Sequence, residues 1–168
     1  PMVGQLSEWR TVRKIVEEIR AEVGAPRVDV GIMIEIPSAA IMATAFAAEV
    51  DFFSIGTNDL TQYTLAIDRQ HPTLTARADG LDPAVLKLIK MTVDGARAHG
   101  KWVGVCGELG SDPQAVPILI GLGVDELSVN IKAVARVKAQ VRQLSLTKSQ
   151  ALAYQALQCT TAAEVRSL

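Results

Sequence analysis

Two carboxylates and an amide follow apolar runs of the sequence. Glu35 lies near the end of the run 28–36, and Asn58 and Asp59 come shortly after a second run, 52–55. A carboxylate in an apolar run costs desolvation free energy unless it has a partner, and two carboxylates brought together repel unless a proton or a cation lies between them. Because hard oxygen ligands suit Mg²⁺ or Mn²⁺, Glu35 and Asp59 are candidate metal ligands.

Each of these residues also has a structural interpretation. Glu35 could satisfy amide groups at the start of a helix that opens at Ser38. Asn58 and Asp59 could form an ordinary turn or a helix cap. The presence of both acids, each following an apolar run, favours the metal site over these alternatives.

A thiol and a guanidinium are the other candidate groups. Cys106 ends a third apolar run, 102–106, and is followed by Gly107 and Glu108. A lone cysteine is usually an inert buried thiol, but a neighbouring glycine allows a ligand to approach closely. Nearby acidic groups favour the protonated thiol, which suits a proton donor better than a nucleophile. Arg69 could bind a phosphate or carboxylate with two hydrogen bonds, although a loop arginine is more often simply solvated.

The apolar pattern predicts an α/β fold in which about five parallel strands alternate with helices. The expected strands are the apolar start of the chain, 28–36, 52–55, 102–106 and 126–129. The expected helices are 7–23 with Ser7 as its cap, 38–48, 82–99, 112–121, 134–144 and two short pieces after residue 147. The polar stretch 57–59 is expected to be a loop. Because the carboxyl ends of parallel strands meet at one rim, the candidate groups should collect there.

Composition limits the kinds of partner. The chain has 168 residues, 17 Lys and Arg against 18 Asp and Glu, and therefore a formal charge of −1. A near-neutral chain offers no general field for nucleic acid or an anionic membrane surface. The apolar stretches 39–48 and 115–122 are shorter than the roughly 18 residues of a membrane span. Cys106 and Cys159 are the two cysteines, which argues against a disulfide framework and favours a reducing cytosol.

Three long strings resemble a known family. They are GIMIEIPSAA at 31–40, DFFSIGTNDLTQYTLAIDR at 51–69 and GKWVGVCGELGSDPQAVPILIGLGVDELSV at 100–129, joined by QALQCTTAAEV near the end. They are similar to the C-terminal domain of the phosphoenolpyruvate-utilising enzymes, and most of all to the enzyme I branch of bacterial sugar phosphotransferase systems. Pyruvate phosphate dikinase and phosphoenolpyruvate synthase share the shorter motifs and remain an alternative. The string HPTLTARADGLDPAVL resembles the enzyme I module of fused multiphosphoryl transfer proteins.

The resemblance implies a fold and a role for each candidate residue. The fold would be the C-terminal part of a (β/α)₈ TIM barrel that binds phosphoenolpyruvate and Mg²⁺ at its rim. Glu35 and Asp59 would ligate the metal ion, Asn58 would hydrogen-bond the phosphoryl group, and Arg69 would grip the phosphate. Cys106 would protonate the methylene carbon of the departing enolate, which yields pyruvate.

The resemblance also indicates what this chain lacks. A whole barrel takes about 250 residues, so 1–168 is expected to be a single partial domain, and its first residue, Pro1, suggests a piece of something longer. The family's phosphorylated histidine and the domain that binds the phosphocarrier protein HPr are expected elsewhere, because His71 and His99 have the wrong sequence contexts.

We therefore expect the parent to be a cytoplasmic, homodimeric phosphotransferase and the fragment alone to be inactive toward HPr. A second hypothesis is that this chain still binds Mg²⁺ weakly together with an oxalate- or pyruvate-like ligand. A purely dimerising role and a metal-dependent lyase or aldolase are the competing hypotheses.

Overall fold

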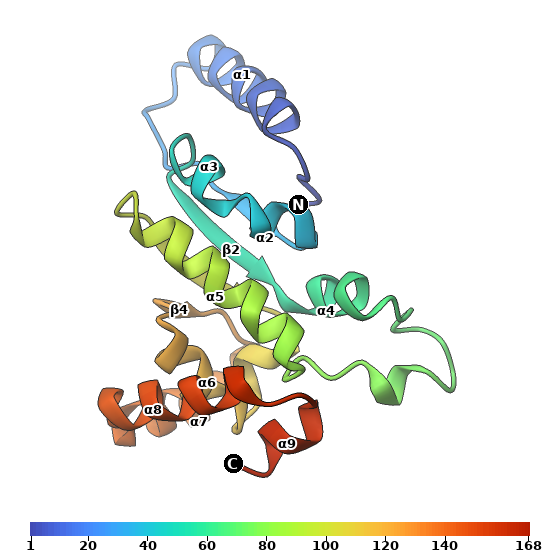
Figure 1. Ribbon diagram of the computed structural model, residues 1–168. Coiled ribbons are helices and arrows are strands. Elements are labelled where there is room, and N and C mark those ends of the chain that lie inside the picture. Colours follow the sequence, from blue (N-terminus) through green and yellow to red (C-terminus); the bar gives the residue numbers. More distant parts are fainter.

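The computed structural model describes residues 1–168, apart from the side chain of Ala76. Its centre is a parallel sheet of four strands in the order β1-β2-β3-β4 (Figure 1). The strands are β1 (Ile32–Ile34), β2 (Phe52–Gly56), β3 (Trp102–Cys106) and β4 (Glu126–Leu127). Neighbours in sequence are neighbours in the sheet, as in a (β/α)₈ barrel and unlike a doubly wound sheet, in which the order reverses. The α/β prediction is therefore confirmed, and the sheet is consistent with part of a TIM barrel.

The predicted fifth strand, at the start of the chain, is wrong. Residues 1–4 have no regular secondary structure, because their amides bond to side chains rather than to a neighbouring strand. The Met2 N–H donates to Glu35 Oε2 at 2.8 Å, and the Gly4 N–H donates to Glu8 Oε2 at 2.8 Å. A strand needs a backbone ladder, so apolar composition alone did not suffice.

The helices largely follow the predicted pattern. They are α1 (Leu6–Glu22), α2 (Pro37–Ile41), α3 (Ala43–Ala47), α4 (Thr57–Leu65), α5 (Pro83–Arg97), α6 (Ala115–Leu122), α7 (Ile131–Gln143), α8 (Leu146–Gln158) and α9 (Ala162–Arg166), with 3-10 turns η1 (Thr75–Arg77) and η2 (Glu108–Ser111). No helix in the part of the chain that the structure describes is both long enough and apolar enough to cross a membrane.

Four local predictions need correction. The strand expected over 28–36 is only Ile32–Ile34, because these are the residues that pair with β2. The stretch 57–59 is the first turn of α4 rather than a loop. The helix expected over 38–48 is interrupted at Met42, which separates α2 from α3. Helix α1 begins one residue before Ser7, because Gln5 and Glu8 form a reciprocal capping box that satisfies amides of the first turn.

One face of the sheet forms the core. Ile34, Phe53, Ile55 and Val105 alternate with open-face residues and are fully buried among apolar helix side chains. Helix α5 packs across β2 and β3 on this face, and α8 packs against α6 beside it (Figure 1). These contacts hold the strands in register and so fix the positions of their carboxyl ends.

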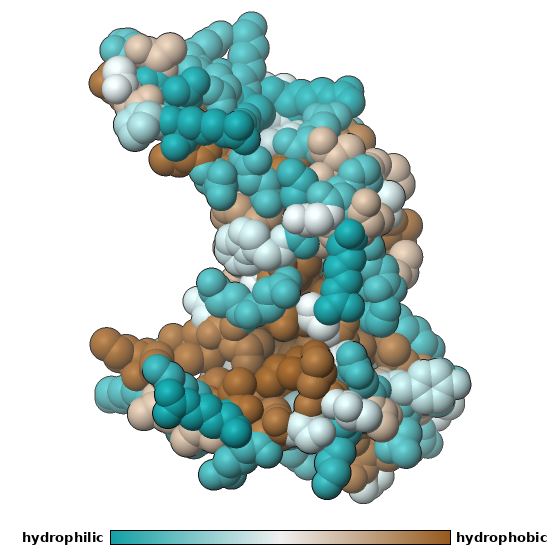
Figure 2. Space-filling model, turned by 90° about the vertical axis from the view of Figure 1, so that its left-hand side faces the viewer, coloured by the Kyte–Doolittle hydropathy of each residue, from teal (hydrophilic) through white to brown (hydrophobic). Residues whose placement is uncertain are grey.

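The opposite face of the sheet is open. Phe52 and Trp102 stack there with ring centroids 4.5 Å apart, and Trp102 remains 40 % exposed. Apolar side chains also reach the surface elsewhere, and Figure 2 shows an apolar area in the lower half of the molecule. Ile131 and Val134 on α7 are 86 % and 47 % exposed. This chain therefore presents apolar surface that another protein segment could cover.

Candidate functional site

Glu35, Gly56 and Cys106 form a row across the carboxyl end of the open face. Gly56 is the register partner of Cys106, and the pairing of β1 with β2 brings Glu35 to the other side of Gly56. A Cβ built on Gly56 would lie 2.6 Å from Glu35 Cγ, so the carboxylate side chain lies over this glycine. The absence of a side chain at Gly56 allows Glu35 to lie there.

Glu35 is buried, with 7 % of its surface exposed, and has one backbone partner. That partner is the Met2 N–H, which donates to Oε2, rather than the amides at the start of the helix near Ser38. The other oxygen, Oε1, lies close over Gly56, 2.9 Å from the Cβ position of that residue. The carboxylate therefore holds one oxygen against the chain and turns the other toward the middle of the row.

Thr57 and Asn58 join the end of β2 to the end of β3. Thr57 Oγ1 donates to the carbonyl of Cys106 at 2.9 Å, and the Glu108 N–H donates to Asn58 Oδ1 at 3.1 Å. Gly107 lies between them with φ +103°, and a Cβ there would be 2.5 Å from Thr57 Oγ1. Since Oδ1 of Asn58 accepts from the chain, its amide nitrogen is the end that can donate to a ligand.

Asp59 and Arg69 face each other on and just after α4. Arg69 Nη2 lies 3.7 Å from Asp59 Oδ1, and the two side chains are 47 % and 27 % exposed. The backbone of Arg69 is held, because its N–H donates to Gln62 Oε1 and its carbonyl accepts from the Thr75 hydroxyl. A long, half-exposed ion pair is weak, so the guanidinium can exchange Asp59 for a phosphate at little cost.

Cys106 is half-buried, and both cysteines of the chain are free thiols. Its Sγ donates to the Ile55 carbonyl at 3.5 Å and accepts from Ser54 Oγ at 3.5 Å. The thiol is thus held by β2 and by its own strand, β3, at the end of the row that starts with Glu35.

A pocket of about 500 Å³ opens beside this row. Its lining includes Asn58 and Arg69, while Glu35, Asp59 and Cys106 lie outside the lining. The lining residues come from α4, the segment before α5, η2 and α9, and are Thr57, Asn58, Thr61, Gln62, Arg69, Thr75, Ala78, Asp79, Gly80, Glu108, Leu109, Asp112 and Arg166. The structure therefore brings two of the five predicted site residues into the pocket. Glu35 and Cys106 lie on the adjacent sheet face, and Asp59 lies on α4 beside Arg69.

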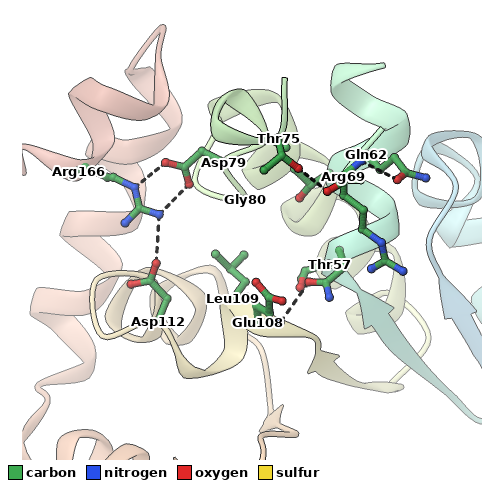
Figure 3. A pocket seen from close by; sticks show the side chains of 13 residues that line it. Thr57, Gln62, Arg69, Thr75, Asp79, Gly80, Glu108, Leu109, Asp112 and Arg166 are labelled. Atoms are coloured by element: carbon green, nitrogen blue, oxygen red, sulfur yellow. Dashed lines mark hydrogen bonds and ion pairs between the residues drawn. The ribbon is translucent and has the colours of Figure 1, made fainter. Parts of the chain in front are cut away.

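Sequence reasoning missed Arg166, which lies across the pocket from Arg69 (Figure 3). Its guanidinium binds both oxygens of Asp79, donates to Asp112 Oδ2 at 3.1 Å and donates to Gln114 Oε1 at 2.9 Å. The string QALQCTTAAEV ends at the residue before it. Its partners lie 52 to 87 positions away, so no local pattern marks the arginine.

This cluster shifts two pKa values. Side-chain hydrogen bonding to Asp79 raises the pKa of Arg166, against the cost of burial. For Asp79, burial acts to raise the pKa, but hydrogen bonds from Arg166 and the Leu81 N–H outweigh it, so the pKa lies below its ordinary value. Because Arg166 is engaged by two carboxylates, Arg69 is the pocket's more available cation for an anionic ligand.

The donor set fits a magnesium ion that takes few protein ligands. In the part of the chain that the structure describes, no three His, Cys, Asp or Glu side chains come together as a metal cluster. Glu35 and Asp59 follow neighbouring strands and supply carboxylate oxygen. Mg²⁺ commonly takes one or two protein carboxylates and completes its shell with water and substrate oxygens. The two carboxylates are therefore the kind of ligand that suits Mg²⁺.

The fold and this arrangement of residues define a known class. The chain belongs to the family of the PEP-utilising enzyme, PEP-binding domain, whose model matches residues 1–146, where PEP stands for phosphoenolpyruvate. Over its whole length it is 58 % identical to a multiphosphoryl transfer protein of Rhodobacter capsulatus and 55 % identical to one of Xanthomonas campestris pv. campestris. It is 41 % identical to a phosphoenolpyruvate-protein phosphotransferase of Staphylococcus carnosus.

These relatives are much longer than the chain. The chain spans 20 % of the length of the two multiphosphoryl transfer proteins and 30 % of the phosphoenolpyruvate-protein phosphotransferase. The resemblance read from the motifs is confirmed, including its two branches. The relative from Staphylococcus carnosus is a phosphotransferase by name.

Proposed function

We propose that this chain supplies the phosphoenolpyruvate- and Mg²⁺-binding part of a cytoplasmic phosphoenolpyruvate-protein phosphotransferase, in its stand-alone or fused multiphosphoryl form. The observation that carries the proposal is the Glu35–Gly56–Cys106 row, with Asn58 and Arg69 in the pocket beside it. A carboxylate, a donor amide, a cation and a thiol thus lie near one end of a parallel sheet. Residues 1–168 act as one partial domain of that protein.

Each side chain has a task in this proposal. Glu35 and Asp59 would hold Mg²⁺, which when bound neutralises charge on the phosphoryl and carboxylate groups. Asn58, whose Oδ1 is occupied by Glu108, would donate its amide N–H to the phosphoryl group. Arg69 would leave Asp59 and bind the phosphate with two hydrogen bonds. Cys106 would protonate the enolate at its methylene carbon, which traps the product as pyruvate.

The phosphoryl acceptor would be a histidine outside this chain, which passes the group on to HPr. His71 is exposed, and its Nδ1 accepts hydrogen bonds from the Thr73 and Leu74 amides, as in a local turn. His99 is also exposed and lies in the turn between α5 and β3. We therefore expect no label on the chain or on HPr after incubation with labelled phosphoenolpyruvate. Labelled HPr would contradict this division of roles.

The binding proposal can be tested on the chain itself. Calorimetry with Mg²⁺ and oxalate, a stable analogue of the enolate of pyruvate, should detect binding by the wild type. Asp59→Ala should abolish it, whereas Asp29→Ala, which removes an exposed carboxylate before the amino end of β1, should not. Equal binding by wild type and Asp59→Ala would reject the assignment of the site.

A second candidate function is self-association. Ile131, Val134 and Val141 on α7 are exposed apolar residues, and the strands at both ends of the sheet, β1 and β4, each pair on one side. A second copy could cover this surface. Sedimentation should then show a dimer that Val134→Lys dissociates, and a monomer at high concentration would count against it.

A further inference from the structure

Ser54 lies on the open face of the sheet, two residues before Gly56 on β2 and so next to the Glu35–Gly56–Cys106 row. It pairs in register with Met33 on β1 and Gly104 on β3. Because Gly104 has no side chain, the Ser54 hydroxyl can reach diagonally across β3 to the next residue on the same face, Cys106. The Ser54 Oγ to Cys106 Sγ distance is 3.5 Å.

The sulfur has two hydrogen-bond contacts, both with β2. The Cys106 S–H donates to the Ile55 carbonyl. The Ser54 O–H donates to the sulfur, and this hydrogen bond strengthens when the sulfur becomes negative, since hydrogen bonds to ionised acceptors are the stronger ones. Among the described residues, the bond to Cys106 is the one hydrogen bond that the Ser54 side chain makes.

The position of the sulfur is otherwise set by the backbone. Thr57 holds the carbonyl of Cys106, and the following Gly107 keeps a left-handed φ of +103°. Rotation about χ1 is then the remaining freedom of the Cys106 side chain. The Ser54 hydroxyl and the Ile55 carbonyl are the hydrogen-bond partners that select its rotamer. Ser54 is therefore placed to influence where the thiol proton is presented.

We propose that Ser54 is a positioning residue for Cys106, holding the sulfur at the row and stabilising the thiolate that remains after proton donation. The inference rests on the proposed function. There, the S–H bond of Cys106 breaks, a C–H bond forms at the methylene carbon of the enolate, and the negative charge moves from the enolate to the sulfur. Ser54 keeps its proton throughout, and water later returns a proton to the thiolate.

Alkylation of the thiol by iodoacetamide tests this without any substrate, because the thiolate is the reactive species. All variants would carry Cys159→Ser, so that Cys106 is the single reporter. At pH 8, Ser54→Ala should lower the alkylation rate of the folded chain about fivefold, as expected for the loss of a hydrogen bond to a charged acceptor. Alkylation in 6 M urea should proceed at the same rate in all variants.

A matched pair separates the hydroxyl from the packing. Ser54→Thr and Ser54→Val have the same shape, but threonine alone keeps the donor, so the threonine variant should react about fivefold faster than the valine variant. A merely structural role predicts the opposite sign for Ser54→Ala, since loosened packing exposes the sulfur and speeds alkylation. An unchanged or faster rate in Ser54→Ala, or equal rates in the matched pair, would overturn the proposal.

The readout is independent of the proposed function. Failure of Mg²⁺ and oxalate to bind would remove the assigned reaction but leave the alkylation contrast intact. Loss of that contrast in a chain that still binds oxalate would remove the role of Ser54 alone.

Discussion

The Thr57 hydroxyl donates a hydrogen bond to the carbonyl of Cys106 at 2.9 Å. Thr57 is 1 % exposed and is the first residue of α4, while Cys106 is the last residue of β3. The bond therefore joins the segment that carries Asn58 and Asp59 to the segment that carries the thiol. The candidate site depends on this junction, because the two segments are 49 residues apart in the chain.

Replacing Thr57 by valine should destabilise the chain by about 1 kcal/mol, since it leaves a partly buried carbonyl without this donor. Thr57→Ser keeps the hydroxyl and should lose less. Urea unfolding followed by circular dichroism measures both. A valine variant as stable as the serine variant would show that the junction contributes nothing.

Gly107→Ala should be more damaging than Gly100→Ala. Both glycines have positive φ, +103° and +64°. Gly107 also has ψ −176°, a region of the backbone that is essentially restricted to glycine and costs another residue about 1–3 kcal/mol. A Cβ at Gly107 would also lie 2.5 Å from Thr57 Oγ1, whereas a Cβ at Gly100 would meet nothing within 4 Å. Equal losses of unfolding free energy for the two variants would show that the close approach at Gly107 does not matter.

Helices α6 and α8 are expected to tolerate no side chain at Gly121. A Cβ there would be 2.0 Å from the carbonyl oxygen of Ser149, so Gly121→Ala must separate the helices at a cost of about 1–3 kcal/mol. Gly110→Ala is the control, because its Cβ would meet its nearest neighbours at 3.5 Å. Thermal melts should rank the two variants in that order, and the reverse order would contradict the packing.

The Ser149 hydroxyl is buried without a hydrogen-bond partner among the described residues. Ser149→Ala removes a polar group that lost its water on folding and gained nothing in return. We expect the unfolding free energy to stay the same or rise by up to about 1 kcal/mol. A clear loss of stability in urea unfolding would indicate a partner for this hydroxyl.

Arg166→Gln should lower stability at neutral pH and have little effect in acid. The pKa of Asp79 is lowered in the folded chain. The Asp79–Arg166 pair therefore stabilises the folded chain at pH values above the ordinary carboxyl pKa of 3.8, and this contribution is lost as the pH falls through the lowered pKa. Arg166 is 36 % exposed, so with solvent screening we expect about 1 kcal/mol at pH 7.

Urea unfolding of wild type and Arg166→Gln from pH 7 down to pH 2 measures this difference. Arg10→Gln is the matched control, because Arg10 pairs with Glu49 at an exposed site away from the pocket. A difference in unfolding free energy between wild type and Arg166→Gln that grows as the pH falls would contradict the expected direction of the pH dependence.

Local signals predicted some elements closely. The strand expected over 102–106 is β3, Trp102–Cys106, and Asp82 caps α5 by accepting from the Ala84 N–H at 2.8 Å. Both depend on neighbouring residues, namely a short apolar run and a cap followed by proline. The apolar start of the chain failed as a strand because a strand also requires a partner, which no local pattern supplies.

By itself, the sequence determined the chemical groups that stand at the strand ends, Glu35, Asn58, Asp59 and Cys106, because apolar runs and the residues that end them are local properties. Only the tertiary structure decided which groups meet. Ser54 reaches Cys106 over 52 positions and Arg166 reaches Asp79 over 87. Such pairs depend on the register of parallel strands and on helix packing, and both arise only when distant segments bury their apolar faces together.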